Sequence, residues 1–332
     1  MSRIVKNSET GKNKILILGA AGFIGTNLTL RLLKEEEELI LFDRSEDLFA
    51  PEVKRAIAAG QAQVVIDSFA EMTDKEEWLQ KISVLKEVKT VYHLVSTTCP
   101  TNSNRNVATE LQDNLISTTY LLDACVEAGV EKIVFLSSGG TVYGKEHTGI
   151  CKEEEEAFPI TVYGLQKLGI EKLLYLYHNM YGLDYRIVRL ANPYGPYQRP
   201  DGVQGAVTTF TWRVLHDMPV EVYGDGSVIR DYIYIDDAIE GILKIVENKG
   251  RYRLYNLGSG NGHKISQVVE AVAEVTGKVP QIVYKPGRPV DVPINVLDIH
   301  RFKEDFGMFE PIGLKEGIRR LAAFYKQKEE NI

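Results

Sequence analysis

The chain has 332 residues, 44% of them hydrophobic and 26% charged, which is the balance of an ordinary globular protein with one large or two unequal domains. Its net charge of −7 at pH 7 argues against a nucleic-acid partner, because a phosphate backbone is bound by a basic surface. The first residues are polar, and no apolar stretch approaches the roughly 20 residues that span a bilayer. We therefore expect no signal peptide, no membrane partner and a cytoplasmic location.

Short β-branched runs alternate with helical patterns through the first half of the chain. Strands are expected at 14–19, 39–43, 62–67, 90–95, 132–137 and 185–190, and helices at 24–35, 74–81, 105–128 and 162–181. Apolar strands separated by helices are typical of a parallel sheet that is covered on both faces. The sequence therefore predicts an α/β fold with a doubly wound parallel sheet, as a dinucleotide-binding domain over residues 1–190.

The residue pattern changes after residue 190, where turn signals with Pro and Gly follow one another at shorter intervals. We expect a smaller mixed α/β region at 191–332 that binds the substrate and is interleaved with the first domain. The acidic runs 35–38 and 153–156 are expected to be solvated surface. The three cysteines, Cys99, Cys125 and Cys151, lack metal-binding spacing and are typical of reduced thiols, so we expect no metal site.

A glycine-rich turn, "GAAGFIG", joins the first strand to its helix and places glycines at positions 19, 22 and 25. Such a turn lets backbone N–H groups approach a pyrophosphate closely, and the helix N-terminus adds positive charge. Asp43, at the end of the second strand, lies where a carboxylate would meet ribose hydroxyls, so the pattern favours NAD over NADP. The alternative is a tight turn without a ligand. The expected cofactor contacts here are Gly19, Gly22, Phe23, Ile24, Gly25 and Asp43.

Asp67 ends the next strand and is followed by Ser68. Two interpretations of this pair stay open. The carboxylate either meets the adenine amino group of the cofactor or caps a turn or helix.

"TVYGLQKLGIEKLL" carries Tyr163 and Lys167 four residues apart at the start of a helix, so that both side chains lie on one face. Tyrosine, with a pKa of about 10, is a poor base at neutral pH. A nearby ammonium and the positive ring of an oxidised nicotinamide would favour the phenolate. Such a tyrosine could take a proton from a sugar hydroxyl while hydride leaves the same carbon.

These motifs together resemble a known family. The resemblance is carried by GxxGxxG, the aspartate after the second strand, "HLVS", "SSGGTVYG" and YxxxK, and it continues through "RLANPYGP", "VYGDGSVIRDYIYIDDAIEGI", "YNLGSG" and "PGRPVDVP". It covers about residues 14–325. The chain resembles the extended short-chain dehydrogenase/reductases, and within them it is most similar to the UDP-sugar 4-epimerases.

The resemblance implies NAD as cofactor, a UDP-sugar substrate and a homodimer, with Tyr163 as base and Lys167 orienting the nicotinamide ribose. The further cofactor contacts that it implies are Leu94, Val95, Ser96, Thr98 and Asn114. The substrate contacts that it implies are Asn192, Arg230, Arg288 and Asp291, the two arginines neutralising the diphosphate. An Arg fork also suits phosphate oxygens on physical grounds, although each arginine could instead pair with a neighbouring aspartate.

The stretch "SSGGTVYG" bears on the subfamily. Dehydratases and decarboxylases of this fold carry acidic or Ser-Glu residues before "VYG", whereas this chain has Gly140 and Thr141, which favours an epimerase. The usual catalytic serine of the epimerases falls on Gly139, so Ser138 or Thr141 must supply the hydroxyl. In an extended chain two residues restore the face of a side chain, which favours Thr141. The alternative is that Tyr163 works alone.

Asn295 falls where glucose-restricted epimerases carry a bulky tyrosine, which predicts that N-acetylated UDP-sugars are accepted alongside UDP-glucose. Several rival functions stay open at this stage. They are a nucleotide-sugar 4,6-dehydratase or decarboxylase, a UDP-glucuronate 4-epimerase, and a non-catalytic NAD-binding regulator.

Overall fold

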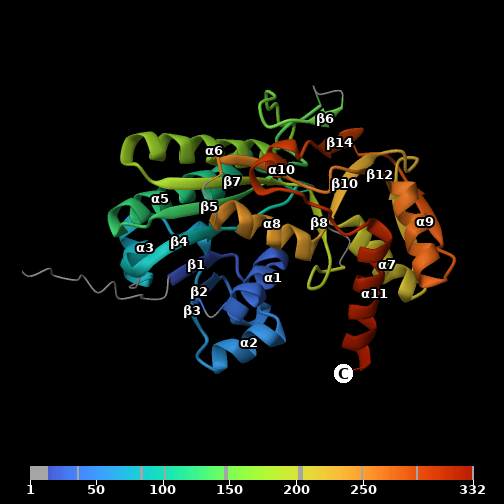
Figure 1. Ribbon diagram of the computed structural model, residues 1–332, viewed down its shortest axis with the longest axis horizontal. Helices are drawn as coiled ribbons and strands as arrows, with labels where there is room; N and C mark the ends of the chain where they lie inside the picture. The colour runs from blue at the N-terminus through green and yellow to red at the C-terminus, as the bar shows by residue number, and fades with distance from the viewer. Residues whose placement is uncertain are drawn as a thin grey trace, which may run out of the picture.

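The computed structural model describes residues 14–35, 37–82, 85–100, 102–145, 149–200, 205–247, 250–288 and 291–330. Its centre is a seven-stranded sheet with the order β11-β7-β5-β4-β1-β2-β3, in which every pair of neighbours is parallel (Figure 1). The strands are β1 (Lys14–Leu18), β2 (Glu38–Asp43), β3 (Ala62–Ile66), β4 (Val88–His93), β5 (Lys132–Ser138), β7 (Asp184–Leu190) and β11 (Leu254–Leu257). The predicted doubly wound parallel sheet is confirmed.

Helices cover both faces of this sheet, as the buried apolar runs of its strands require. Helices α1 (Phe23–Leu32), α2 (Pro51–Ala58) and α8 (Ile235–Glu247) lie on one face, and α3 (Lys75–Lys81), α5 (Ser117–Ala128) and α6 (Val162–Tyr181) on the other (Figure 1). Successive strand residues alternate between the two cores: Ile15 and Ile17 belong to one, Leu16 and Leu18 to the other.

Three features of this layer differ from the sequence prediction. Helix α2 is present although no helix was expected there; it is only eight residues long and begins at a proline. The long helical pattern at 105–128 is divided into α4 (Val107–Glu110), a π-helical segment at Leu111–Ile116, and α5. The edge strand β11 comes from the C-terminal half of the chain and pairs with β7.

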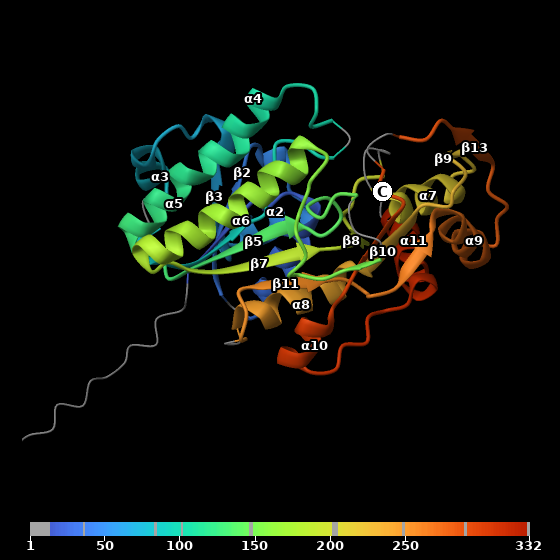
Figure 2. The ribbon, with the colours of Figure 1, turned by 90° about the horizontal axis from the view of Figure 1, so that it is seen from above.

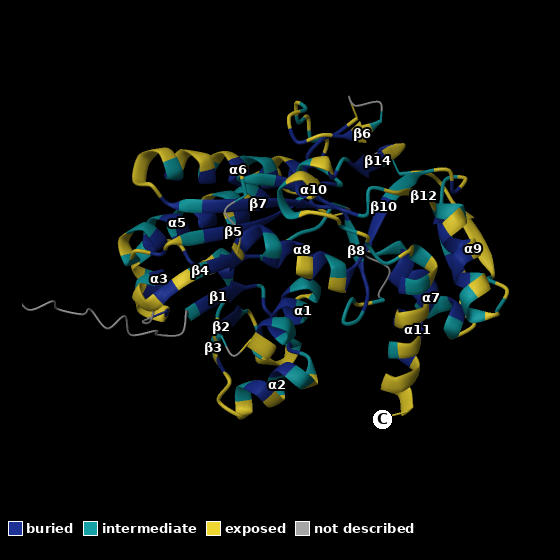
Figure 3. Ribbon diagram, in the orientation of Figure 1, coloured by how far each residue is buried: buried dark blue, intermediate teal, exposed yellow. Residues whose placement is uncertain are grey.

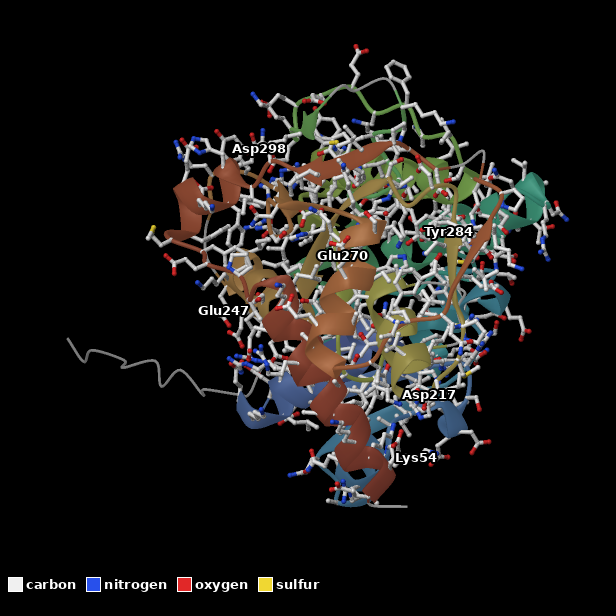
Figure 4. The ribbon with its side chains drawn as sticks, turned by 90° about the vertical axis from the view of Figure 1, so that its right-hand side faces the viewer. Lys54, Asp217, Glu247, Glu270, Tyr284 and Asp298 are labelled. Atoms are coloured by element: carbon white, nitrogen blue, oxygen red, sulfur yellow. The ribbon has the colours of Figure 1, made fainter. Side chains whose placement is uncertain are left out.

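A smaller mixed layer lies beyond the carboxyl ends of the large sheet (Figure 2). Strand β10 (Ile229–Tyr234) pairs antiparallel with β12 (Gly262–Lys264) and parallel with β14 (Ile294–Leu297) and β8 (Asn192–Tyr194). The remaining elements are β6 (Ile150–Cys151), β9 (Val220–Tyr223), β13 (Ile282–Lys285), α7 (Ala206–Leu215), α9 (Ile265–Thr276), α10 (His300–Phe306) and α11 (Leu314–Glu330). Figure 4 shows this part from outside, with Glu270 on α9 and Tyr284 on β13.

The second acidic run is not uniformly solvated, contrary to the sequence prediction. Glu154 and Glu156 are exposed, but the side chain of Glu153 is only 3% exposed. Its Oε1 accepts the backbone N–H of Asn256 at 2.8 Å, which fixes the segment after β6 against β11. In the first run, Glu35 and Glu38 are exposed, whereas Glu36 lies outside the described residues. Among the described helices, none combines the length and apolarity that crossing a membrane requires.

Candidate active site

A cavity of about 520 Å³ lies between the two layers, at the carboxyl ends of the parallel strands, where ligands of open α/β sheets bind. The expected site residues that line it are Gly19, Gly22, Phe23, Ile24, Gly25, Leu94, Ser138, Thr141, Tyr163, Asn192, Arg230, Arg288 and Asp291. The expected site residues that lie outside its wall are Asp43, Asp67, Ser68, Val95, Ser96, Thr98, Asn114, Lys167 and Asn295.

The glycine-rich turn fits a pyrophosphate. A Cβ on Gly25 would lie 2.1 Å from the carbonyl oxygen of Gly19, so a side chain there would push α1 away from the turn. Gly19 itself has a φ of 83°, which favours glycine. The first turn of α1 lines the cavity, and its N-cap residue Gly22 has no side chain that could bond the N–H groups there. A ligand phosphate can accept them.

Asp43 and Asp67 lie side by side at the ends of β2 and β3, since Asp67 N–H donates to the carbonyl of Asp43 at 3.0 Å. The carboxylate of Asp43 accepts the N–H of Ala21 at 2.9 Å and so holds the glycine turn. Asp67 accepts the N–H of Ser68 at 2.8 Å and pairs with Lys81 at 2.5 Å. Of the two interpretations of Asp67, these contacts favour the turn cap.

Asn114 holds the loop after β4 by hydrogen bonds, although it does not itself line the cavity. It is 3% exposed, its Oδ1 accepts the N–H of Thr97 at 2.9 Å, and its Nδ2 donates to Thr97 Oγ1 at 2.7 Å. Within the loop, Ser96 Oγ donates to the carbonyl of Thr98 at 3.0 Å. The loop that carries Leu94 along the cavity is therefore held by its own hydroxyls and by Asn114.

Tyr163 and Lys167 lie on one face of α6, which begins at the N-cap residue Thr161. Lys167 is 3% exposed; its Nζ donates to the carbonyl of Leu136 at 2.9 Å and lies 5.7 Å from the centroid of the Tyr163 ring. Burial lowers the pKa of Lys167 to about 7, against the opposing charge of Glu171. The same burial and the charge of Lys167 lower the pKa of the neighbouring His93 to about 3.

The pKa of Tyr163 departs from the expectation of a lowered value. Burial raises it, and the charge of Cys99 adds to the increase. A lowered pKa of Tyr163 is expected from two positive charges, the Lys167 ammonium and the oxidised nicotinamide ring. The protein itself supplies only the ammonium. The side chains alone therefore hold Tyr163 as a neutral phenol.

The stretch "SSGGTVYG" is a turn, not an extended chain. Strand β5 ends at Ser138, whose carbonyl accepts the N–H groups of Thr141 at 3.3 Å and Val142 at 3.2 Å. The alternation argument that favoured Thr141 is therefore wrong. Both Ser138 and Thr141 nevertheless line the cavity. The Oγ1 of Thr141 is buried and has no hydrogen-bond partner among the described residues.

Gly139 packs closely against the smaller layer. A Cβ there would lie 2.5 Å from Leu297 Cδ1, so a serine at this position would require the Leu297 side chain on β14 to move.

Two arginines line the far end of the cavity. Arg230 Nη1 donates to the carbonyl of Val292 at 2.5 Å, and its Nη2 lies 3.6 Å from Asp291 Oδ1. The guanidinium of Arg288 stacks on the ring of Tyr223, 3.5 Å from its centroid. Asn192 reaches the same wall and donates to the carbonyl of Asp231 at 2.9 Å. This end can hold a dianion between two fixed guanidinium groups.

Asn295 lies behind the cavity wall and not on it, which corrects its expected position. It is 1% exposed, and its Nδ2 donates to the carbonyl of Gly139 at 2.9 Å. Sequence reasoning also missed Phe210, Arg213 and Tyr223, which line the cavity from α7 and β9. No motif marks them, because their contact with the cavity depends on how the smaller layer packs.

Comparison with known proteins agrees with this geometry. The model of the NAD dependent epimerase/dehydratase family matches residues 15–258. The chain belongs to this family. It is 31% identical to a dTDP-4-dehydro-6-deoxyglucose reductase of Escherichia coli, an alignment that covers 94% of this chain and 98% of the relative. It is 30% identical to a UDP-glucose 4-epimerase of Mycolicibacterium smegmatis, over 96% of this chain and 100% of the relative.

Among solved structures, the fold is similar to a UDP-glucose 4-epimerase of Thermotoga maritima crystallised with UDP-glucose. The TM-score is 0.86 and the identity 32%, over 95% of this chain and 99% of that one. Other similar proteins are named UDP-glucuronate 4-epimerases or nucleotide-sugar dehydratases. The protein is thus an NAD-dependent enzyme of nucleotide-sugar chemistry, and the glycine turn of α1 and the loop after β4 fit that cofactor.

The lowered pKa of Lys167 predicts a pH-dependent stability difference between the wild-type protein and the Lys167→Met variant. The folded-state pKa is about 7 against 10.5 for a free lysine, so between these values the unfolded chain binds a proton that the folded protein lacks. Stability conferred by the wild-type residue therefore rises with pH across this window. Urea unfolding without added nucleotide should show the wild-type protein gaining on the variant from pH 7 upward. A difference that is independent of pH would contradict the lowered pKa of Lys167.

Proposed function

We propose that the protein is an NAD-dependent 4-epimerase of a UDP-sugar that works through a transient 4-keto intermediate. The observation that carries this proposal is the pairing of Tyr163 with two hydroxyls, Ser138 and Thr141, on a wall without an acid. The carboxylates among the described lining residues, Glu221 and Asp291, belong to the same end as Arg230 and Arg288. Elimination of water needs a general acid near the reacting carbon, whereas reversible oxidation does not.

NAD, when bound, accepts a hydride from the sugar carbon and returns it. The protein's own groups handle the proton: the Tyr163 hydroxyl oxygen exchanges it with the sugar O4, and a neighbouring hydroxyl donates a hydrogen bond to the same oxygen. Lys167 lies beside Tyr163 on α6, with its Nζ 5.7 Å from the ring centroid, and an ammonium there would favour the phenolate. Return of hydride to the other face requires the sugar to turn over within the cavity.

The far end of the cavity would bind the diphosphate and the uridine. Arg230 and Arg288 are held by Val292 and Tyr223, so their guanidinium groups lose little further freedom on binding. Asp291 would face the uridine, and Asn192 the sugar side. Substrate binding energy at this end anchors the nucleotide while the hexose at the other end stays free to rotate.

The substrate range is proposed to include N-acetylated UDP-sugars. Asn295 is compact and packs behind Gly139, and the wall in front of it is formed by Gly140. A Cβ on Gly140 would have no neighbour nearer than 3.8 Å, so this part of the wall is open. A substituent at the sugar C2 position would have room beside Gly140.

The decisive experiment is incubation of the protein with UDP-glucose, UDP-N-acetylglucosamine or UDP-glucuronate, without added NAD, followed by NMR of the C4 configuration. We expect epimerisation of UDP-glucose and of the N-acetylated sugar. A Tyr163→Phe variant should lose at least about 100-fold in kcat, because it lacks the proton-transfer group.

Each other result of that experiment identifies a different enzyme. Turnover of UDP-glucuronate alone would indicate a glucuronate epimerase, and a stable 4-keto-6-deoxy product would indicate a dehydratase. A reductase would be detected in a separate incubation with NADH and a 4-keto sugar, as stoichiometric consumption of NADH. No product from UDP-N-acetylglucosamine, with UDP-glucose active, would exclude the wider substrate range.

Thr141, rather than Ser138, is proposed to donate to the sugar O4, because its buried Oγ1 has no partner among the described residues. Loss of a hydrogen bond to a developing charge costs about 1.5–3 kcal/mol, so Thr141→Val should lower kcat by about 10- to 100-fold. Ser138→Ala serves as the matched control and should lower kcat much less. The reverse order of the two effects would assign the role to Ser138.

The protein is proposed to form a homodimer through the outer face of α6. Leu165, Tyr175, Leu176 and Met180 are 46%, 62%, 47% and 56% exposed there, and Ile116 lies on the adjacent π-helical segment with 38% exposed. Figure 3 shows this exposed face along α6. So many large apolar side chains on one helix are typical of an association surface.

Light scattering tests this association. We expect a mass of twice the 37.3 kDa chain for the wild-type protein and a monomer for Leu176→Glu. The control is Val279→Glu, which changes an equally apolar, 94% exposed side chain elsewhere and should leave the dimer intact. A monomeric wild-type protein would contradict the proposal.

A further inference from the structure

A buried ion pair lies directly behind the candidate active site. Glu171 on α6 and Arg189 on β7 are each 3% exposed. Arg189 Nε donates to Glu171 Oε1 at 3.0 Å, and its Nη2 to Oε2 at 2.7 Å, so that the contact is bidentate. Desolvating two charges offsets most of what their attraction contributes, so such a pair is weak evidence for a purely stabilising role.

Glu171 also reaches the cavity floor. The hydroxyl of Ser137, which lines the cavity, donates to Glu171 Oε1 at 2.5 Å. On α6, Glu171 follows Lys167 by four residues and Tyr163 by eight, and this spacing places all three side chains on one face of the helix. The carboxylate thus touches one wall of the site and faces the side chain that supports Tyr163.

We propose that Glu171 is a positioning residue for the reaction: clamped by Arg189, its carboxylate fixes the Ser137 hydroxyl at the cavity floor and supplies the counter-charge that keeps buried Lys167 an ammonium beside Tyr163. This inference rests on the proposed epimerase function and adds to it a group that does not touch the substrate. It explains why a costly buried pair lies one helical turn from the lysine.

The groups around Lys167 leave this role to Glu171. From β4, His93 faces the lysine as a neutral imidazole, because its pKa is lowered to about 3. From β5, the Leu136 carbonyl and the Phe135 ring contact the ammonium, and from α6 the ring of Tyr163 lies nearby. Arg189 on β7 contacts Glu171 and is not among the groups whose charge shifts the pKa of Lys167. Among the described residues, Glu171 is the carboxylate whose charge raises the pKa of Lys167.

The sign of the expected effect follows from this arrangement. Removing the carboxylate charge lowers the pKa of Lys167 further, so the ammonium is lost at a lower pH. The alkaline limb of the kcat profile should therefore move to lower pH, by about one unit for a charge one helical turn away. KM should change little, because Glu171 does not line the cavity.

The test compares Glu171→Gln, which removes the charge with little change in shape, with Glu171→Asp, which keeps the charge. For the Gln variant we expect the alkaline limb to shift by about one pH unit and kcat to fall about tenfold at neutral pH, with KM within about twofold. For the Asp variant, the alkaline limb of the kcat profile should lie close to its wild-type pH. Wild-type kcat and pH profile in a folded Gln variant, or equal behaviour of Asp and Gln, would overturn the proposal.

The matched control is Asp184→Asn, which removes a carboxylate paired with Arg186 at 2.9 Å at the opposite end of β7. It should affect stability without shifting the pH profile. If Glu171→Gln does not fold because Arg189 is left unpaired, the double variant Glu171→Gln/Arg189→Met removes both charges. The same downward shift is expected for it, and an unshifted limb would overturn the proposal.

A second readout separates this inference from the proposed function. Ionisation of Tyr163 is measured as the ultraviolet difference between each protein and its Tyr163→Phe counterpart, with NAD present and without sugar. Glu171→Gln should move this titration to higher pH, because the tyrosine loses the support of the ammonium. If no sugar is epimerised but the titration shifts, the function is wrong and the role of Glu171 stands. If epimerisation occurs and the titration does not shift, the role of Glu171 is wrong.

Discussion

The hydrogen bond between Lys167 Nζ and the carbonyl of Leu136 ties the start of α6 to the carboxyl end of β5. Burying an amine at this depth is unfavourable, and the structure compensates with a carbonyl, two aromatic faces and the carboxylate of Glu171. Tyr163 lies one turn before Lys167 and is therefore fixed against the same edge of the sheet. The position of Tyr163 therefore depends on the contacts of buried Lys167.

The two ends of the cavity are lined by different kinds of side chain because they come from different layers. The larger layer supplies the glycine turn and the hydroxyls, which follow strand ends at one edge of the sheet, and Tyr163 at the start of α6. The smaller layer supplies the arginines and closes the wall, with Leu297 against Gly139 and Asn295 behind it. One cavity is therefore lined by residues of both layers.

Most of the large sheet could be predicted, because its first six strands are mostly apolar runs that alternate with helices along the chain. Strand β11 could not, since its four residues belong to the sheet only through pairing with β7, far away in the sequence. The sequence predicts an extended chain at 139–142 because two glycines carry no pattern, whereas the carbonyl of Ser138 sets a turn there. The sequence predicts a solvated Glu153 because its hydrogen-bond partner, Asn256, is distant in the sequence.

The sequence by itself determined the cofactor-binding turn, the tyrosine–lysine pair and the family, since each is a short motif whose geometry is local. The tertiary structure alone decided that Ser138 and Thr141 both line the cavity, where Asn295 lies and that Glu171 is held by Arg189. These depend on contacts between residues far apart in the chain, and burial then sets the charges. That is the physical reason why Lys167, an ordinary lysine in the sequence, has a pKa of about 7 in the fold.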